Sequence, residues 1–324
     1  MQIKNFGRRI YKSSLFGVIV FLVGLCVVFS LVTSNFSTFY NAKVIMLSAM
    51  ITAVVGLSQM SVIATGGMNL SVGYIGGLAA IFCASAMQDW GVSTVVAILI
   101  GLAIGTVAGL INGMLVHFLG GTSGMSFLIT LGTSFAFQGI MQGYSQASSY
   151  VNLNKSFSAI GATEFLGMPV LMYVMLVLAL LMWLFFKYTG LGRQILAFGA
   201  NNRAAKLYGV RQGTAIISAH TLSGLLAACA GIMLSMRMGS ATIDIGIDWM
   251  LFSFAAPVIG GTRQAGGKVN VWGVIIGAII LSIIENGIVH LNISVYWNEF
   301  IRGVVILLAV VIDSIRNSRR AVAK

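Results

Sequence analysis

The sequence predicts an all-α polytopic membrane protein of about ten transmembrane helices with glycine-broken segments. Of its 324 residues, 58% are hydrophobic and 8% are charged, whereas ordinary globular domains carry about 25% charged residues. The apolar residues also come in long runs, most of them close to the roughly 20 residues that a helix needs to cross a bilayer. A β-barrel would instead show alternating segments of about ten residues, and the sequence has no such pattern.

The chain begins with a basic segment, residues 1–14, that we expect in the cytoplasm. An apolar run at about 15–33 follows it, and Arg8 and Arg9 give the region some likeness to a signal peptide. The run is about eighteen residues long, however, where a signal peptide has about 7–15, and no small-residue cleavage site follows it. We therefore predict an uncleaved first span.

Nine further apolar stretches complete a single transmembrane domain over residues 15–313. We place these spans at about 42–63, 72–88, 92–118, 124–143, 168–186, 214–236, 249–260, 269–290 and 297–313. In the stretch 92–118, one helix face carries glycines at four-residue steps, namely Gly101, Gly105, Gly109 and Gly113. Such a face lets the backbone of a neighbouring helix approach closely.

Basic residues indicate the orientation of the chain. Fifteen of the nineteen Lys and Arg residues fall in residues 1–14, the loop 187–213, the turn 260–268 and the tail 314–324. Because cytoplasmic segments are enriched in Lys and Arg, we expect both termini in the cytoplasm and the polar segment 144–167 outside. The net charge of +12 reflects this arrangement and does not indicate nucleic-acid binding.

The loop 187–213 carries five basic residues and no acid. Asn201 can cap a short helix that begins near Arg203 and ends at Gly209, after a hydrophobic piece that closes at Gly199. We expect this helix to turn a small, apolar face outward, made by Ala204, Ala205, Leu207 and Tyr208. Such a face suits a groove on a soluble partner. An ordinary loop whose charges only set the orientation is the alternative.

Two turns on the expected cytoplasmic side share a glycine pattern. GGMNLSVG occupies 66–73 and GGTRQAGG occupies 260–267, each with a double glycine and another glycine at its eighth position. Helices broken near the membrane free backbone groups that line a cavity. We therefore expect gating positions at Gly66, Gly67, Gly73, Gly260, Gly261, Gly266 and Gly267. Ordinary turns that need a positive φ are the alternative.

The sequence shows no catalytic or metal-binding motif. GGTRQAGGKV lacks a Walker A frame, because Lys268 is followed by Val269, and neither HExxH nor GxSxG occurs. We therefore expect no catalytic residue, no metal and no cofactor in this chain. Glu285 lies inside a predicted span, where an acid marks function by default. A proton or ion site there competes with a structural hydrogen bond to Asn286.

Six motifs in order carry a family resemblance. They are GGMNLSVG (66–73), SFLITLG (126–132), GRQILAFGANNRAAKLYGV (192–210), GLLAACAGI (224–232), APVIGGTRQAGG (256–267) and VVILLAVVID (304–313). Together they resemble the membrane permease subunits of ribose-type, carbohydrate-importing ABC transporters, over nearly the whole chain. The resemblance implies a bacterial inner-membrane subunit that translocates a monosaccharide or a related sugar-derived solute.

The same resemblance implies that this subunit lies in the lipid bilayer and works with three partner proteins. ATP-binding cassette ATPase subunits would bind the ATP, a periplasmic substrate-binding protein would dock on the outer loops, and a second permease copy or a paralogue would complete a dimer. The family's coupling helix maps here to about 199–209. The sequence departs from the family at Asn69, Met250 and Phe252, where acids are usual, although Asp248 is nearby.

The residues expected along the substrate path are polar or aromatic. They are Asn69, Ser71, Asn112, Phe135, Gln138 and Gln142, the last two on one helix face. Hydrogen bonding between helices is the alternative role for each of them. A polyol, a nucleoside or a sugar-derived signal molecule remains an alternative cargo. An ion-coupled secondary transporter that uses Glu285 and an integral-membrane enzyme are the rival functions.

Overall fold

The computed structural model describes residues 14–33, 35–121 and 123–291, and beyond them only 294, 297, 300, 301, 303, 304 and 307. The basic N-terminal segment, most of the tenth predicted span and the basic tail lie outside the described residues. Within the described part the fold is helical, as predicted, apart from one two-stranded antiparallel hairpin.

Helices coincide with most of the predicted spans. The long helices are α2 (Ser14–Val32), α3 (Phe39–Ile63), α4 (Val72–Gln88), α5 (Thr94–Phe118), α6 (Ser123–Ser145), α8 (Val170–Tyr188), α11 (Gln212–Met238) and α14 (Val271–His290). Among the described residues, six of them (α3, α5, α6, α8, α11 and α14) are long and apolar enough to cross a membrane. Helix α4 and residues Val18–Val32 of α2 are shorter apolar helices.

The predicted span 249–260 is wrong as a single helix. It consists of α12 (Trp249–Phe252) and α13 (Ala255–Ile259), joined by a turn at Ser253 and Phe254. Pro257 has no N–H to donate to the carbonyl of Ser253, so a continuous helix would lose a hydrogen bond there. The apolar composition of this stretch suggested a span, but the proline divides it.

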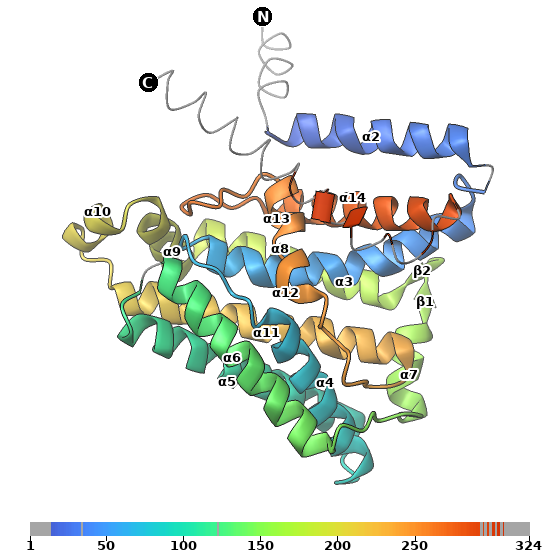
Figure 1. Ribbon diagram of the computed structural model, residues 1–324, viewed down its shortest axis with the longest axis horizontal. Coiled ribbons are helices and arrows are strands. Elements are labelled where there is room, and N and C mark those ends of the chain that lie inside the picture. Colours follow the sequence, from blue (N-terminus) through green and yellow to red (C-terminus); the bar gives the residue numbers. More distant parts are fainter. Residues whose placement is uncertain are drawn as a thin grey trace, which may run out of the picture.

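Helix α11 lies at the centre of the bundle and packs against α5, α3 and α4 (Figure 1). Its contact with α5 runs through the glycine face of that helix. A Cβ added to Gly113 would lie 2.7 Å from the Cα of Ile217, and one added to Gly109 would lie 2.9 Å from the Cα of Gly224. The close approach predicted from the four-residue glycine steps is therefore confirmed.

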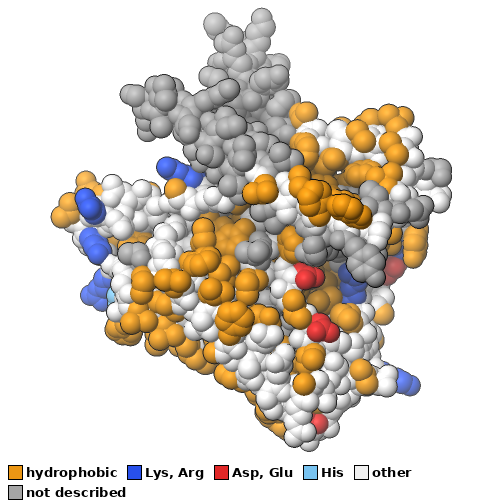
Figure 2. Space-filling model, viewed as in Figure 1, with side chains coloured by type: hydrophobic (Ala, Val, Ile, Leu, Met, Phe, Trp, Pro, Cys, Tyr) orange, Lys and Arg blue, Asp and Glu red, His pale blue; other side chains and the backbone are white. Residues whose placement is uncertain are grey.

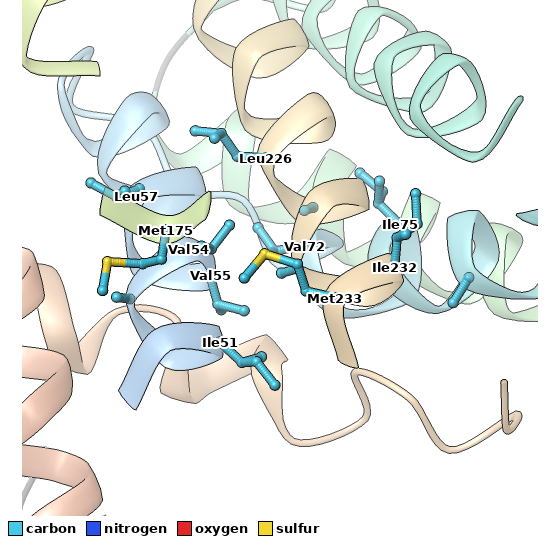
Figure 3. Close-up of a cluster of buried hydrophobic side chains, with 14 of the residues drawn as sticks. Ile51, Val54, Val55, Leu57, Val72, Ile75, Met175, Leu226, Ile232 and Met233 are labelled. Carbon is cyan, nitrogen blue, oxygen red and sulfur yellow. The ribbon is translucent and has the colours of Figure 1, made fainter. Parts of the chain in front are cut away.

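Aliphatic and methionine side chains fill the space between α3, α4, α8 and α11 (Figure 3). The labelled members are Ile51, Val54, Val55, Leu57, Val72, Ile75, Met175, Leu226, Ile232 and Met233. The chain also carries large apolar side chains on its surface, as Figure 2 shows in orange. Exposed apolar side chains on long helices suit contact with lipid, where they cost no hydrophobic free energy.

The segment 144–167 is folded onto the end of the bundle. It contains α7 (Lys155–Ala162) and β1 (Glu164–Phe165), and β1 pairs with β2 (Met168–Pro169). Tyr150 forms a backbone bridge with Ala241, and its hydroxyl donates to Asp89 Oδ2 at 2.6 Å. Partial burial, and then this hydrogen bond, raise the pKa of Tyr150.

Candidate functional site

The loop 187–213 forms two helices, α9 (Gly190–Ala200) and α10 (Asn202–Leu207). Asn201 caps α10, as its sequence predicts, because its Oδ1 accepts a hydrogen bond from the backbone N of Ala204 at 3.0 Å. Gly209 follows the helix with a φ of +80°, a conformation that favours glycine. The helix predicted to start near Arg203 is therefore present and begins one residue earlier.

The outward face of α10 differs from the prediction. Ala205 is only 5% exposed and faces the protein, whereas Leu207 and Tyr208 are each 88% exposed. Ala205 is therefore buried, Ala204 is partly buried, and of the four predicted residues Leu207 and Tyr208 are the ones that face outward. The outward surface consists of two large apolar side chains beside the exposed Arg203 and Lys206. Figure 1 shows α10 at one edge of the molecule.

Three backbone segments meet beside α9. The N–H of Gly267 donates to the carbonyl of Ala64 at 3.0 Å. A Cβ added to Gly266 would lie 2.7 Å from the N of Gly66 and 2.9 Å from the O of Gly199. The second glycine segment thus touches Gly199 near the end of α9, and the first is joined to it through Gly266 and through Ala64, two residues before Gly66. We call this contact the glycine junction.

The seven predicted gating glycines fall into two groups. A positive φ is found at Gly66, Gly261, Gly266 and Gly267. The others, Gly67, Gly73 and Gly260, allow close approach instead: Gly73 packs on the backbone of Gly246, and Gly260 packs on that of Gly273. The turn geometry is therefore present, and a gating role remains a prediction.

Three of the predicted substrate-path residues form one buried network. Asn69, Ser71 and Asn112 are each 0% exposed. Asn112 Nδ2 donates to Ser71 Oγ at 2.6 Å, and Ser71 Oγ donates to Asn69 Oδ1 at 2.7 Å. Asn69 Nδ2 in turn donates to Ser223 Oγ at 3.0 Å, and Ser223 Oγ lies 2.9 Å from Ser58 Oγ. We call these five residues the septum.

Asn69 uses both ends of its amide in this network. An amide both donates and accepts, so Asn69 donates to Ser223 while it accepts from the N and Oγ of Ser71. Within the described residues Asn112 Oδ1 is buried without a partner, so the network retains one unused acceptor.

The other three path candidates lie apart from the septum, on α6. Phe135 is 59% exposed, and Gln138 and Gln142 are half-buried. Three other side chains of α6 bond to the backbone of the glycine segment 66–73: Ser123 at Gly66, Ser126 at Met68 and Thr130 at Leu70. Ser126 and Thr130 stand at positions i and i+4 of the SFLITLG motif, a spacing that places both hydroxyls on one face of α6 and that could have indicated this contact.

Two cavities lie at opposite ends of the septum. The α9 cavity has a volume of about 380 Å³ and is lined among others by Thr65, Ser126 and His220. The α12 cavity has a volume of about 190 Å³, between α3, α11, α12 and α14. His220 is fully enclosed, with its Nδ1 3.0 Å from the carbonyl oxygen of Ile216.

The order of residues along α3 and α11 places the septum between the cavities. On α3, Val55 lines the α12 cavity and Ser58, one turn further on, belongs to the septum, while Thr65 in the turn after α3 lines the α9 cavity. Val55 and Ser58 share one helix face, because they are three residues apart. The eight steps from Val55 to the end of α3 at Ile63 cover about 12 Å at ~1.5 Å per residue. On α11 the same order is Leu234, Ser223 and Ile216.

Glu285, the predicted ion site, lines a cavity, while the neighbouring Asn286 bonds to another helix. Asn286 pairs reciprocally with Asn41 on α3, at 2.8 and 3.0 Å, while Glu285 lines the α12 cavity with Arg237 and Asp248. No group of three or more His, Cys, Asp or Glu residues that could hold a metal occurs in the described part of the chain.

These features define a class of protein: a multi-pass helical membrane protein in which a loop of two short helices contacts two glycine-rich turns. The chain matches the family model described as "Branched-chain amino acid transport system / permease component" over residues 41–310. It belongs to this permease family.

Similar proteins narrow the family to permeases named for sugars. The galactose/methyl galactoside import permease protein of Escherichia coli is 31% identical, over 94% of this chain and 95% of its own length. The ribose import permease protein of Escherichia coli is 32% identical over 95% and 97%, and the D-allose transport system permease protein of Escherichia coli is 33% identical over 88% and 86%. No solved structure matches the chain.

The resemblance to carbohydrate-importing ABC permeases is therefore confirmed. The chain is a transport subunit and not an enzyme, and it is a multi-pass protein of the inner membrane. Permeases of this kind work with an ATPase, which binds the ATP, and with a periplasmic binding protein.

Proposed function

We propose that this chain is the permease subunit of an ATP-driven, binding-protein-dependent importer of a monosaccharide or a related sugar-derived solute. About ten helices cross the inner membrane with both termini in the cytoplasm, and a second copy or a paralogue completes the dimer. The galactose, ribose and allose permeases support this cargo class, because each matches over most of its length. A polyol, a nucleoside or a sugar-derived signal is the alternative cargo.

The glycine junction is the observation that carries the mechanism. The ATPase docks on α10 through Leu207 and Tyr208, which are apolar and project into solvent. A movement of α10 and α9 reaches Gly199 and therefore both glycine segments, since all three are in backbone contact. The coupling residues Gly199, Asn201, Arg203, Ala204, Ala205, Leu207 and Gly209 thus divide into inward packing and outward docking positions.

The septum then acts as the barrier that this movement opens. Asn69 and Ser71 belong to the first glycine segment, while Ser223 and Asn112 lie on α11 and α5. A displacement of the segment separates these pairs and connects the α12 cavity, which faces outward, with the α9 cavity, which faces the cytoplasm. Alternating access of this kind uses broken helices near the bilayer midplane.

Reconstitution in vesicles tests the proposal. The chain is combined with its ATPase and a binding protein, and uptake of galactose, ribose, allose and leucine is compared with and without ATP. We expect ATP-dependent uptake of at least one sugar and none of leucine. Uptake by the isolated chain driven by a proton gradient would instead favour the ion-coupled rival, and uptake of leucine alone would refute the cargo class.

A further inference from the structure

The α12 cavity gathers ionisable groups of both signs from three separate elements. Arg237 lies in the last turn of α11, Asp248 directly precedes α12, and Glu285 lies in the second half of α14. Acidic and basic side chains are grouped on the face of the molecule where α12 lies (Figures 1 and 2). Charged groups within a membrane protein are costly and mark a function or a pathway.

Arg237 and Trp249, which both line the α12 cavity, are held in fixed positions. Arg237 Nη1 donates to the carbonyl of Leu47 at 2.9 Å, which ties the guanidinium to α3. The indole of Trp249 packs on α4, because a Cβ added to Gly76 would lie 2.8 Å from its Cζ3. The hydroxyls of Ser48 and Thr52 complete the polar lining, and Phe252 adds a second aromatic group.

This set of groups matches the chemistry of a neutral sugar ring. Carboxylates accept hydrogen bonds from hydroxyl groups, and a guanidinium donates several in a planar fork. An aromatic ring offers an apolar surface to the C–H face of the same molecule. The volume of about 190 Å³ equals that of about six liquid waters at ~30 Å³ each. It therefore suits one small polar solute.

The cavity is also placed where a solute would arrive. It borders the break between α12 and α13, and broken helices line the solute sites of many transporters. The segment 237–248, which begins and ends at two of its charged residues, is a connection that a binding protein can reach. From the cavity, α3 and α11 lead through Ser58 and Ser223 toward the α9 cavity.

We propose that the α12 cavity receives one monosaccharide-sized polyhydroxylated solute, held by Arg237, Asp248 and Glu285 against Trp249. The inference rests on the proposed function for the direction of transport and for the cargo class. It assigns solute contact to residues other than the six path candidates. It also replaces the ion site at Glu285 with a role in hydrogen bonding to the cargo.

Charge-removing, shape-conserving variants test the site in the reconstituted complex. Glu285→Gln and Asp248→Asn are compared with Asp89→Asn, an exposed acid outside the cavity whose donors Ser85 and Tyr150 can still bond to the amide oxygen. We expect each cavity variant to lower sugar uptake about tenfold or more, the effect of losing ~1.4 kcal/mol of binding. ATP hydrolysis stimulated by the binding protein should persist, and Asp89→Asn should behave as the parent.

Thiol labelling gives a second readout that does not depend on those variants. In a chain whose Cys26, Cys83 and Cys229 are replaced by serine, Ser48→Cys is labelled by a membrane-impermeant thiol reagent. The transported sugar should slow this labelling and should leave the labelling of Lys155→Cys on α7 unchanged.

The possible outcomes distinguish a failure of the proposed α12 cavity site from a failure of the proposed sugar-importer function. Parent-like sugar uptake in both cavity variants, or no sugar protection at Ser48→Cys, would overturn the site while the sugar importer stands. Loss of stimulated ATP hydrolysis together with uptake would also overturn it, because the acids would then belong to the binding-protein interface. A parent complex that carries leucine and no sugar would overturn the proposed function and the assigned solute class together.

Discussion

Ser223 joins three separate parts of the chain through one hydroxyl group. It accepts a hydrogen bond from Asn69 and lies within hydrogen-bonding distance of Ser58. All three side chains are 0% exposed. Because no water reaches these groups, each lost partner leaves a buried donor or acceptor unsatisfied, which costs more than the bond itself contributed.

Ser223→Ala should therefore lower the thermal unfolding midpoint of the purified chain. The change leaves Asn69 Nδ2 without its acceptor, at a cost of about 1–3 kcal/mol. Ser235→Ala is the matched control, because Ser235 is equally buried on α11 but, within the described residues, bonds only to the carbonyl of Gly231 in its own helix. Equal midpoints for the two variants would contradict the bridging role of Ser223.

At the scale of elements, α5 and α11 depend on an uninterrupted glycine face. A Cβ at Gly105 would lie 2.8 Å from the carbonyl oxygen of Gly224 and would also meet Ala228. Gly132 on α6 has no atom within 4 Å of the same position. The two glycines therefore separate the effect of packing from that of helix propensity.

Gly105→Ala should destabilise the chain, and Gly132→Ala should not. Overpacking costs about 1–3 kcal/mol, whereas alanine is intrinsically favoured over glycine in a helix by ~1 kcal/mol. Thermal unfolding in detergent measures both variants. A loss of stability at Gly132 as large as that at Gly105 would show that the α5–α11 contact is not the cause.

The docking role of α10 is tested at Leu207, a large apolar side chain that is 88% exposed. Leu207→Asp should lower copurification of the ATPase about tenfold, because a central apolar anchor contributes most of an interface's free energy. Leu166→Asp, at a leucine that is 83% exposed between β1 and β2, is the control on the opposite end of the fold. ATPase recovery that is unchanged in Leu207→Asp would refute docking through this surface.

For the whole molecule, the sequence predicted the helices well because hydropathy decides where a chain can cross a membrane. It also placed the cap at Asn201 and the glycine face of α5, since both follow from local spacing. The break within the predicted span 249–260 was missed, because hydropathy does not register that Pro257 cannot donate a helical hydrogen bond. Local rules were sufficient wherever the deciding contacts lie within one helix.

The arrangement of the site could be predicted only in part. Asn69, Ser71 and Asn112 do meet, but Phe135 and the two glutamines of α6 do not join them, because rotation of α6 is set by its tertiary packing. The inward position of Ala205 and the grouping of Arg237 with Glu285 likewise depend on contacts between residues far apart in sequence. Spacing along one helix carries no information about such contacts.

In the proposed mechanism α9 moves the two glycine segments through backbone contact at Gly199. The most direct measurement is the number of sugar molecules transported per ATP hydrolysed by reconstituted complexes that carry Gly199→Ala or Gly190→Ala. A Cβ at Gly199 would collide with the carbonyl of Ala64, whereas one at Gly190 meets nothing within 4 Å. We predict that Gly199→Ala keeps the ATPase bound and active but loses most transport per ATP, while Gly190→Ala matches the parent. An unchanged ratio in Gly199→Ala would contradict coupling through the glycine junction.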